Sequence, residues 1–90
     1  MEEARDPAGV LAYPLATEKA TMMIEKQNII TYVVDIRATK PQIKRAVESM
    51  FGVKVSCVRC ETTMHNVKKA FVRLAKPYNA SDVAEKLKLV

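Results

Sequence analysis

Residues 29–36, IITYVVDI, constrain the fold most, because β-branched and aromatic side chains fill most of the run. Such side chains favour extended backbone, and successive residues of a strand point to opposite faces. Tyr32 and Val34 then share one face of a strand, whereas Thr31 and Val33 share the other. The run predicts a β-strand, and the rest of the chain must supply its partners.

The segment that follows, TKPQIKRAVESMFG at residues 39–52, carries the signals of a capped helix. Thr39 and Gln42 have the spacing of a capping box, in which each side chain bonds the other residue's backbone N–H. Pro41 falls in the first turn, where its missing N–H costs nothing, and Gly52 is a typical C-terminal stop. Apolar residues recur between them at helical spacing, so a strand and a helix alternate here.

Four further segments complete the predicted elements. Residues 17–27 and 79–90 have the capping residues and apolar spacing of helices. Residues 53–63 and 68–76 are typical of strands, and the short link between them predicts an antiparallel hairpin. The predicted order is helix–strand–helix–strand–strand–helix. This order indicates an α+β fold in which helices cover a small antiparallel sheet, in a ferredoxin-like, split βαβ arrangement.

A chain of 90 residues makes one domain. Residues 1–14 are expected to be a flexible lead, and residues 15–90 to form a single folded domain. The first ten residues, MEEARDPAGV, are acidic and resemble neither a secretion signal nor an arginine-rich transit peptide. No apolar run is long enough to span a bilayer, so a cytoplasmic protein without membrane insertion is expected.

The CVRC stretch at residues 57–60 has the spacing of a metal or redox pair, but it falls in a predicted strand. Residues three apart on a strand point to opposite faces, so Cys57 and Cys60 cannot hold one ion together. His65 is the one further histidine or cysteine, whereas a structural zinc site needs four ligands. A redox pair needs a helix N-terminus to lower the thiol pKa, and none is predicted there. We therefore expect no metal site and no cofactor.

Charge is concentrated in the middle of the chain, where residues 36–76 hold ten basic side chains and two acidic ones. A block of one sign at this density favours a polyanionic partner, because a merely solvated surface scatters both signs. Catalytic patterns are missing: the chain has one histidine, no glycine-rich phosphate loop and no His-Glu-x-x-His motif. A nucleic-acid-binding protein, not an enzyme, is expected.

The segments YPLATEKA, IKRAV and KKAFVRL, in this order and spacing, resemble the ribosomal protein L23 family of the large subunit, in its archaeal or eukaryotic form. The resemblance covers roughly residues 12–90. It implies a structural protein that binds large-subunit rRNA beside the exit of the nascent-peptide tunnel. It also implies contacts with neighbouring ribosomal proteins, and docking of the signal recognition particle and ribosome-associated chaperones.

The resemblance also implies site residues. Five lysines stand in the family's motifs and become candidate rRNA contacts: Lys19, Lys40, Lys44, Lys68 and Lys69. Four arginines join them by charge and position alone: Arg37, Arg45, Arg59 and Arg73. Glu18 belongs to the Thr-Glu-Lys motif and is expected to dock a chaperone or targeting factor. The alternative role for Glu18 is a carboxylate that stabilises the positive end of its helix.

Two segments depart from the family pattern. Arg59-Cys60 stands where Asn-Thr is usual, which removes any RNA contact made by that asparagine. The link TTMHNV lacks a Pro-Asp-Gly turn and is much shorter than the loop that bacterial members send into the tunnel. An archaeal origin, or a lineage with trimmed ribosomal proteins, is therefore expected, since the basic N-terminal extension of many eukaryotic members is also missing.

Two other functions remain open on the sequence alone. A free-standing RNA-binding domain of another pathway would bind many RNAs without attaching to a ribosome. A small ferredoxin-like enzyme would need a catalytic arginine and asparagine at an anion pocket, and no such pocket is marked. Only five aromatic residues are present, so RNA recognition by shape and phosphate is expected in place of base stacking.

Overall fold

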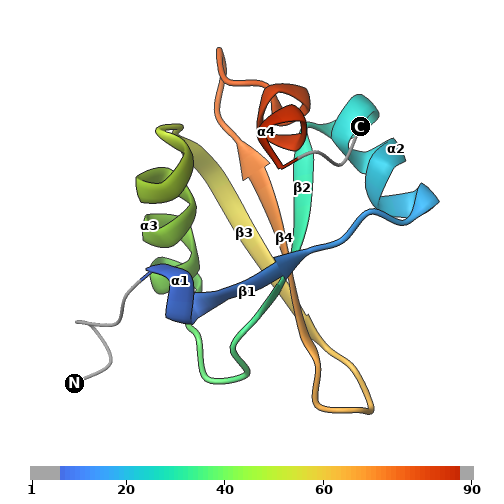
Figure 1. Ribbon diagram of the computed structural model, residues 1–90, viewed down its shortest axis with the longest axis vertical. Coiled ribbons are helices and arrows are strands. Elements are labelled where there is room, and N and C mark those ends of the chain that lie inside the picture. Colours follow the sequence, from blue (N-terminus) through green and yellow to red (C-terminus); the bar gives the residue numbers. More distant parts are fainter. Residues whose placement is uncertain (1–6, 88–90) are drawn as a thin grey trace.

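The structure is a computed structural model that describes residues 7–87 (Figure 1). Its elements are α1 (Pro7–Val10), β1 (Leu11–Pro14), α2 (Glu18–Gln27), β2 (Ile29–Val34), α3 (Lys40–Phe51), β3 (Val55–Thr62), β4 (Lys68–Leu74) and α4 (Ala80–Lys86). The four strands form one antiparallel sheet in the order β1-β2-β4-β3. None of the described helices is long and apolar enough to cross a membrane.

The predicted α+β class is confirmed, and so is the split βαβ arrangement. β2 and β3 both run antiparallel to β4, which lies between them, so they are parallel to each other and joined through α3. The predicted capping box of α3 is present: Thr39 Oγ1 accepts from Gln42 N–H, and Gln42 Oε1 accepts from Thr39 N–H. Gly52 follows the helix with a φ of +65°, where glycine meets no Cβ penalty.

Neither α1 nor β1 is predicted by the sequence, which assigns residues 7–14 to a lead without regular structure. Leu11 pairs with Val34 and Tyr13 pairs with Val33 of β2. Since β1 stands at the end of the strand order, it is an edge strand of the sheet. A four-residue strand is too short to show alternation, and its last residue is a proline, which an edge position tolerates. The folded unit therefore begins before residue 15.

Several ends differ from the predicted ones. β2 stops at Val34, and Ile36 lies in the following turn with 45% of its surface exposed. β3 and β4 are each shorter than predicted. By contrast, Thr17 caps α2 as predicted, because its Oγ1 accepts a hydrogen bond from Ala20 N–H at 3.1 Å. The helix predicted over residues 79–90 begins at Ala80 and ends at Lys86, and Leu87 lies in a turn; residues 88–90 lie outside the described range.

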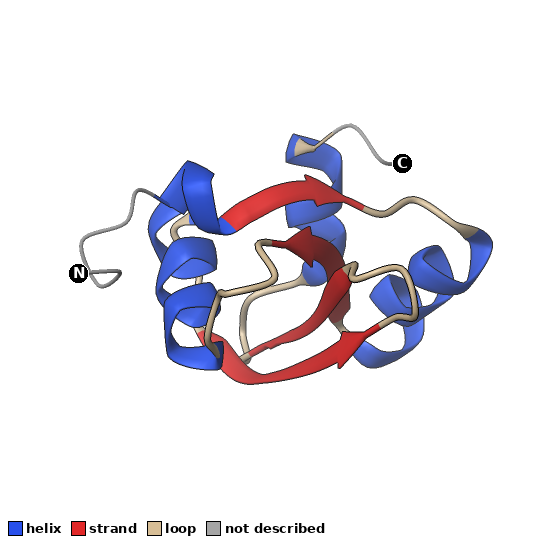
Figure 2. Ribbon diagram, turned by 90° about the horizontal axis from the view of Figure 1, so that it is seen from below, coloured by secondary structure: helices blue, strands red, loops and turns tan. Residues whose placement is uncertain are grey.

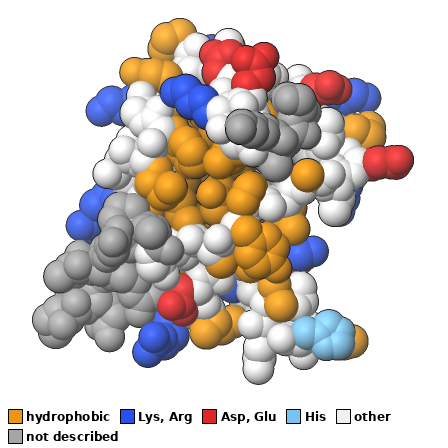
Figure 3. All heavy atoms as spheres, viewed as in Figure 1, with side chains coloured by type: hydrophobic (Ala, Val, Ile, Leu, Met, Phe, Trp, Pro, Cys, Tyr) orange, Lys and Arg blue, Asp and Glu red, His pale blue; other side chains and the backbone are white. Residues whose placement is uncertain are grey.

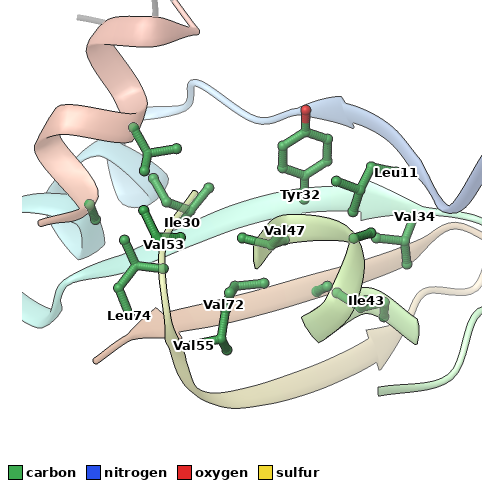
Figure 4. Packing of buried hydrophobic residues seen from close by; sticks show 14 of the residues in the cluster. Leu11, Ile30, Tyr32, Val34, Ile43, Val47, Val53, Val55, Val72 and Leu74 are labelled. Atoms are coloured by element: carbon green, nitrogen blue, oxygen red, sulfur yellow. The ribbon is translucent and has the colours of Figure 1, made fainter. Parts of the chain in front are cut away.

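The main core fills one face of the sheet, where α3 and α4 pack. Figure 4 shows Ile43 and Val47 of α3 lying against Val34 and Val72 of the strands. Tyr32 is buried among them, and this burial raises the pKa of its phenol above the ordinary value. In Figure 3 hydrophobic side chains gather between α3 and α4, above β1.

The two edge strands each carry an irregularity in the ladder. On β3, Val55 pairs with Leu74 and Cys57 with Arg73, so Ser56 is an extra residue. A similar shift separates Leu11 from Tyr13 on β1. Bulges of this kind are common on edge strands and change which side chains face the core.

Asn28 joins three elements at the end of α2. Its backbone is left-handed, with a φ of 58°. Its side-chain Nδ2 donates to the carbonyl oxygens of Leu74 and Tyr78, at 3.1 and 3.0 Å. Its Oδ1 accepts from Ala80 N–H at 2.6 Å, at the start of α4. One side chain thus links the α2–β2 turn, the end of β4 and the first turn of α4.

Candidate nucleic-acid interface

The second face of the sheet, opposite the main core, gathers most of the polar strand residues. We call it the open face, and the pairing register assigns to it Tyr13 of β1, Ile29, Thr31 and Val33 of β2, Lys69, Phe71 and Arg73 of β4, and Cys57, Arg59 and Glu61 of β3. Its β2 residues are buried, because α2 packs along that strand. The β3 and β4 residues are exposed or half-buried. The open face is therefore accessible along β3 and β4.

Three predicted cations lie on this accessible half. Arg59 and Arg73 are exposed, and Lys69 is half-buried. Arg59 pairs across the ladder with Phe71, the residue between Lys69 and Arg73 on the same face. Arg59 is therefore the diagonal neighbour of both Lys69 and Arg73, and diagonal neighbours on one face of a sheet lie about 7–8 Å apart, comparable to the spacing of successive phosphates along a nucleic-acid strand. Glu61, opposite Lys69, is the one acidic residue among the open-face positions.

α2 adds a fourth cation beside this face. Lys19 lies in the first turn of α2, and together with Lys69 it lines a hollow between α2 and the sheet. Lys19 and Lys69 come from segments far apart in the sequence, and only the fold brings them to one site. The open face and its rim thus hold four of the nine predicted rRNA-binding residues.

A second group of predicted residues lies on α3 and in the turn before it. Lys40, Lys44 and Arg45 are exposed on α3, and Arg37 Nε lies 3.8 Å from Asp35 Oδ1 in the turn. Figures 1 and 2 show α3 on one side of the sheet and α2 on the other. The α3 cations therefore form a surface separate from the open face.

Glu48 of α3 has a different role from the one its spacing suggests. An i, i+4 pair with Lys44 is expected from the helix alone. Instead, Glu48 Oε2 accepts a hydrogen bond from Val55 N–H at 3.0 Å, at the start of β3. The carboxylate therefore ties the helix to the edge strand.

Lys68 is held inside the fold, unlike the other predicted cations. Its Nζ donates to the carbonyl oxygen of Ala38 at 2.6 Å, and the side chain is half-buried. The bond links the start of β4 to the turn before α3. A phosphate would have to compete with this carbonyl for the ammonium group.

Two cations missed by the sequence motifs lie near Arg73. Lys26 at the end of α2 and Lys76 after β4 line, with Arg73, a hollow of about 410 Å³ at one end of the sheet. Arg73 Nε also donates to the carbonyl oxygen of Gln27, at 3.5 Å. No spacing rule links residues 26 and 76, so this grouping is visible only in the fold.

The prediction that the two cysteines face opposite ways is confirmed. Cys57 is exposed on the open face beside Arg73, whereas Cys60 is half-buried and packs against the core. His65 is exposed in the turn between β3 and β4. Within residues 7–87, no three histidine, cysteine or acidic side chains come together in a way that could hold a metal ion.

Glu18 is the first residue of α2, and its side chain is exposed. It follows the capping residue Thr17, where a negative charge is stabilised by the helix dipole. The carboxylate is therefore both a helix-stabilising group and an accessible acidic contact.

A family model described as Ribosomal protein L23 matches residues 9–69. The match runs from α1 into β4 and spans about two thirds of the chain. It includes Glu18 and every predicted cation except Arg73.

Proposed function

Since the chain belongs to the ribosomal protein L23 family, a family of large-subunit structural components that bind rRNA, we propose that its open face is the main rRNA contact. The family is non-enzymatic, and its partners are rRNA and other ribosomal proteins. The accessible half of the open face supports the proposal, because Arg59, Lys69 and Arg73 lie on it as near neighbours.

The chemistry of these side chains fits a phosphate backbone. Arginine presents a planar fork of N–H donors that can meet two phosphate oxygens at once, whereas lysine acts as a point charge. Arg59 and Arg73 are both exposed, so neither needs to break a buried contact to reach a phosphate. The α3 group of Arg37, Lys40, Lys44 and Arg45 supplies a second contact on the other side of the sheet, to a different rRNA segment.

The rRNA-binding unit that we propose is one domain. It contains residues 15–90 and also β1, because β1 pairs with β2 and brings Tyr13 to the open face. Cutting the chain at residue 15 would remove an edge strand and leave without partners those N–H and C=O groups of β2 that face β1, whereas those that pair with β4 would keep theirs.

The two cysteines provide a direct test of this interface. Cys57 is expected to react readily with a maleimide in the free protein and to be strongly protected in purified large subunits, because rRNA covers the open face. Cys60 is expected to react slowly in both states, because it packs against the core. Quantitative mass spectrometry of the two modified peptides measures both rates in one sample.

Cys60 serves as the internal control for unfolding during isolation. Fast labelling of Cys57 on intact subunits, with Cys60 still slow, would show that the open face is free there. The α3 surface would then be the main rRNA contact.

At a finer level, we propose that this protein lies beside the exit of the nascent-peptide tunnel and docks the signal recognition particle and chaperones through Glu18. We also propose the archaeal or eukaryotic type. The short turn between Thr62 and Lys68 supports that type, since it cannot reach into the tunnel. The exposed carboxylate of Glu18 supports a charged docking contact.

A Glu18→Ala substitution tests the docking proposal. Its affinity, on the ribosome, for the signal recognition particle is expected to fall about tenfold or more, because a basic partner group loses its carboxylate. Binding of the purified particle to salt-washed ribosomes measures the change. Glu25→Ala, an exposed carboxylate two turns further along α2, should leave docking unchanged. Equal affinities of both variants would assign Glu18 to helix stabilisation alone.

A further inference from the structure

Thr31 presents an unpaired polar group in an otherwise satisfied part of the fold. The residue is only 3% exposed, and its Oγ1 is buried without a hydrogen-bond partner. Within the described residues, no other buried side-chain nitrogen or oxygen lacks a partner. A buried hydroxyl without a partner is unfavourable, because it has lost its water and gained nothing in exchange. A buried polar group without a partner calls for an explanation, and a partner that arrives with a bound ligand is one such explanation.

Thr31 lines the hollow between α2 and the open face. Phe71 forms part of the wall, and Lys19, Lys69 and Glu61 also line it. Its volume is about 90 Å³. The hollow is too small for a whole nucleotide, but it can admit the edge of a base or of a ribose.

The residues around the hollow match the parts of one nucleotide. The Phe71 ring offers an apolar surface to a base, and Glu61 can accept from a base amino group or a ribose hydroxyl. Lys19 and Lys69 together supply two ammonium groups for the phosphate. An acidic peptide would meet the same lysines, but its carboxylates leave the Phe71 ring without a planar partner, so the combination of an aromatic ring and two ammonium groups favours a nucleotide.

We propose that this hollow is a binding site for a single unpaired rRNA nucleotide, which rests on Phe71 and bonds the Thr31 hydroxyl. The inference rests on the proposed rRNA contact and adds a base-directed component to it. The nucleotide must be unpaired, because the bases of an RNA helix are stacked on one another and leave no face free to rest on Phe71. The protein would therefore recognise a base as well, whereas the sequence predicts recognition of rRNA by shape and phosphate.

A Thr31→Val substitution gives two effects of opposite sign. The free protein is expected to become more stable and to melt a few degrees higher, because valine has nearly the same shape and no unpaired hydroxyl. Affinity for deproteinised large-subunit rRNA from the source organism is expected to fall about fivefold to tenfold, because the nucleotide loses a hydrogen bond in a buried site. Affinity for a fully paired RNA duplex should not change.

A Phe71→Leu substitution tests the stacking contact. Its rRNA affinity is expected to fall about tenfold, with the slope of log affinity against log salt unchanged, because stacking releases no counterions. Phe51→Leu is the matched control, a half-buried phenylalanine at the end of α3, and should leave rRNA affinity unchanged. Thermal unfolding of both variants checks that each one folds cooperatively.

The outcomes separate this inference from the proposed function. Weaker rRNA binding by Thr31→Val and Phe71→Leu, with duplex binding and salt slope kept, supports the nucleotide site. Unchanged rRNA binding by both variants overturns the site but leaves the phosphate contact of the open face intact. If the unsubstituted protein binds rRNA no better than duplex, both the site and the specific rRNA contact fail.

Discussion

An Asn28→Ala variant is expected to lose about 3–5 kcal/mol in its free energy of unfolding. The side chain makes three hydrogen bonds to backbone groups of Leu74, Tyr78 and Ala80, and each bond contributes roughly 1 kcal/mol. Alanine also tolerates the left-handed backbone at this position poorly, at a cost of about 1–2 kcal/mol. Domains of this size have total stabilities of only about 5–13 kcal/mol, so the loss would be a large fraction.

Urea denaturation of the free protein, followed by circular dichroism, measures this loss. Asn66→Ala is the matched control: Asn66 also has a left-handed backbone, with a φ of 59°, but it lies exposed in the turn after β3. The control should lose only about 1–2 kcal/mol, the backbone cost alone. Asn28→Gly loses the same three hydrogen bonds but tolerates the left-handed backbone, so its loss of unfolding free energy should lie between those of Asn28→Ala and Asn66→Ala. Equal losses at Asn28 and Asn66 would mean that the three side-chain bonds contribute nothing.

Replacing Arg59 and Arg73 together by glutamine is expected to weaken binding to large-subunit rRNA by about 100-fold or more. Each arginine would lose a charge-assisted contact of roughly 1.5–3 kcal/mol. The salt dependence should fall as well, by about 0.7–0.9 in the slope of log affinity against log salt for each phosphate contact removed. Filter binding across a series of salt concentrations measures the affinity and the slope together.

The control for this variant removes the same charge from another place. Lys54 and Lys86 are exposed, and neither belongs to the open face or to the α3 group. Their double glutamine variant should bind with nearly unchanged affinity. If both double variants weaken binding equally, rRNA attraction depends on net charge and not on the open face. A Lys40→Gln, Lys44→Gln variant measures the share contributed by α3.

Much of the fold follows from local signals in the sequence. The cap of α3 depends on Thr39, Gln42 and Gly52, which act within one segment, so their effect is independent of tertiary context. The hairpin of β3 and β4 follows from their short link. β1 could not be predicted, because its stability comes from pairing with β2 and not from its own four residues.

The candidate interface was less predictable than the fold. The sequence assigned the basic residues to a helix and to strands, but the side of the sheet on which each one lies depends on the strand register and on how the helices pack. It gave Lys68 the same standing as Lys69, although only the fold brings Lys68 to the carbonyl oxygen of Ala38. Thr31 carried no signal, because an unpaired hydroxyl becomes recognisable only when its surroundings are known.

The extra residue on β3 has a consequence for how this strand can change in evolution. Side chains of a regular strand alternate between its two faces, and Ser56, as one inserted residue, shifts this alternation by one position. Upstream of it Val55 belongs to the core, and downstream Val58 and Cys60 take over that role. Deleting Ser56 would make Val55 and Cys57 sequence neighbours opposite Arg73 and Leu74, which are also neighbours, so the residues after the bulge would keep their present faces. β3 can therefore lose this one residue without exchanging its core side chains and its open-face side chains, whereas a second deletion, with no bulge left to absorb it, would exchange them.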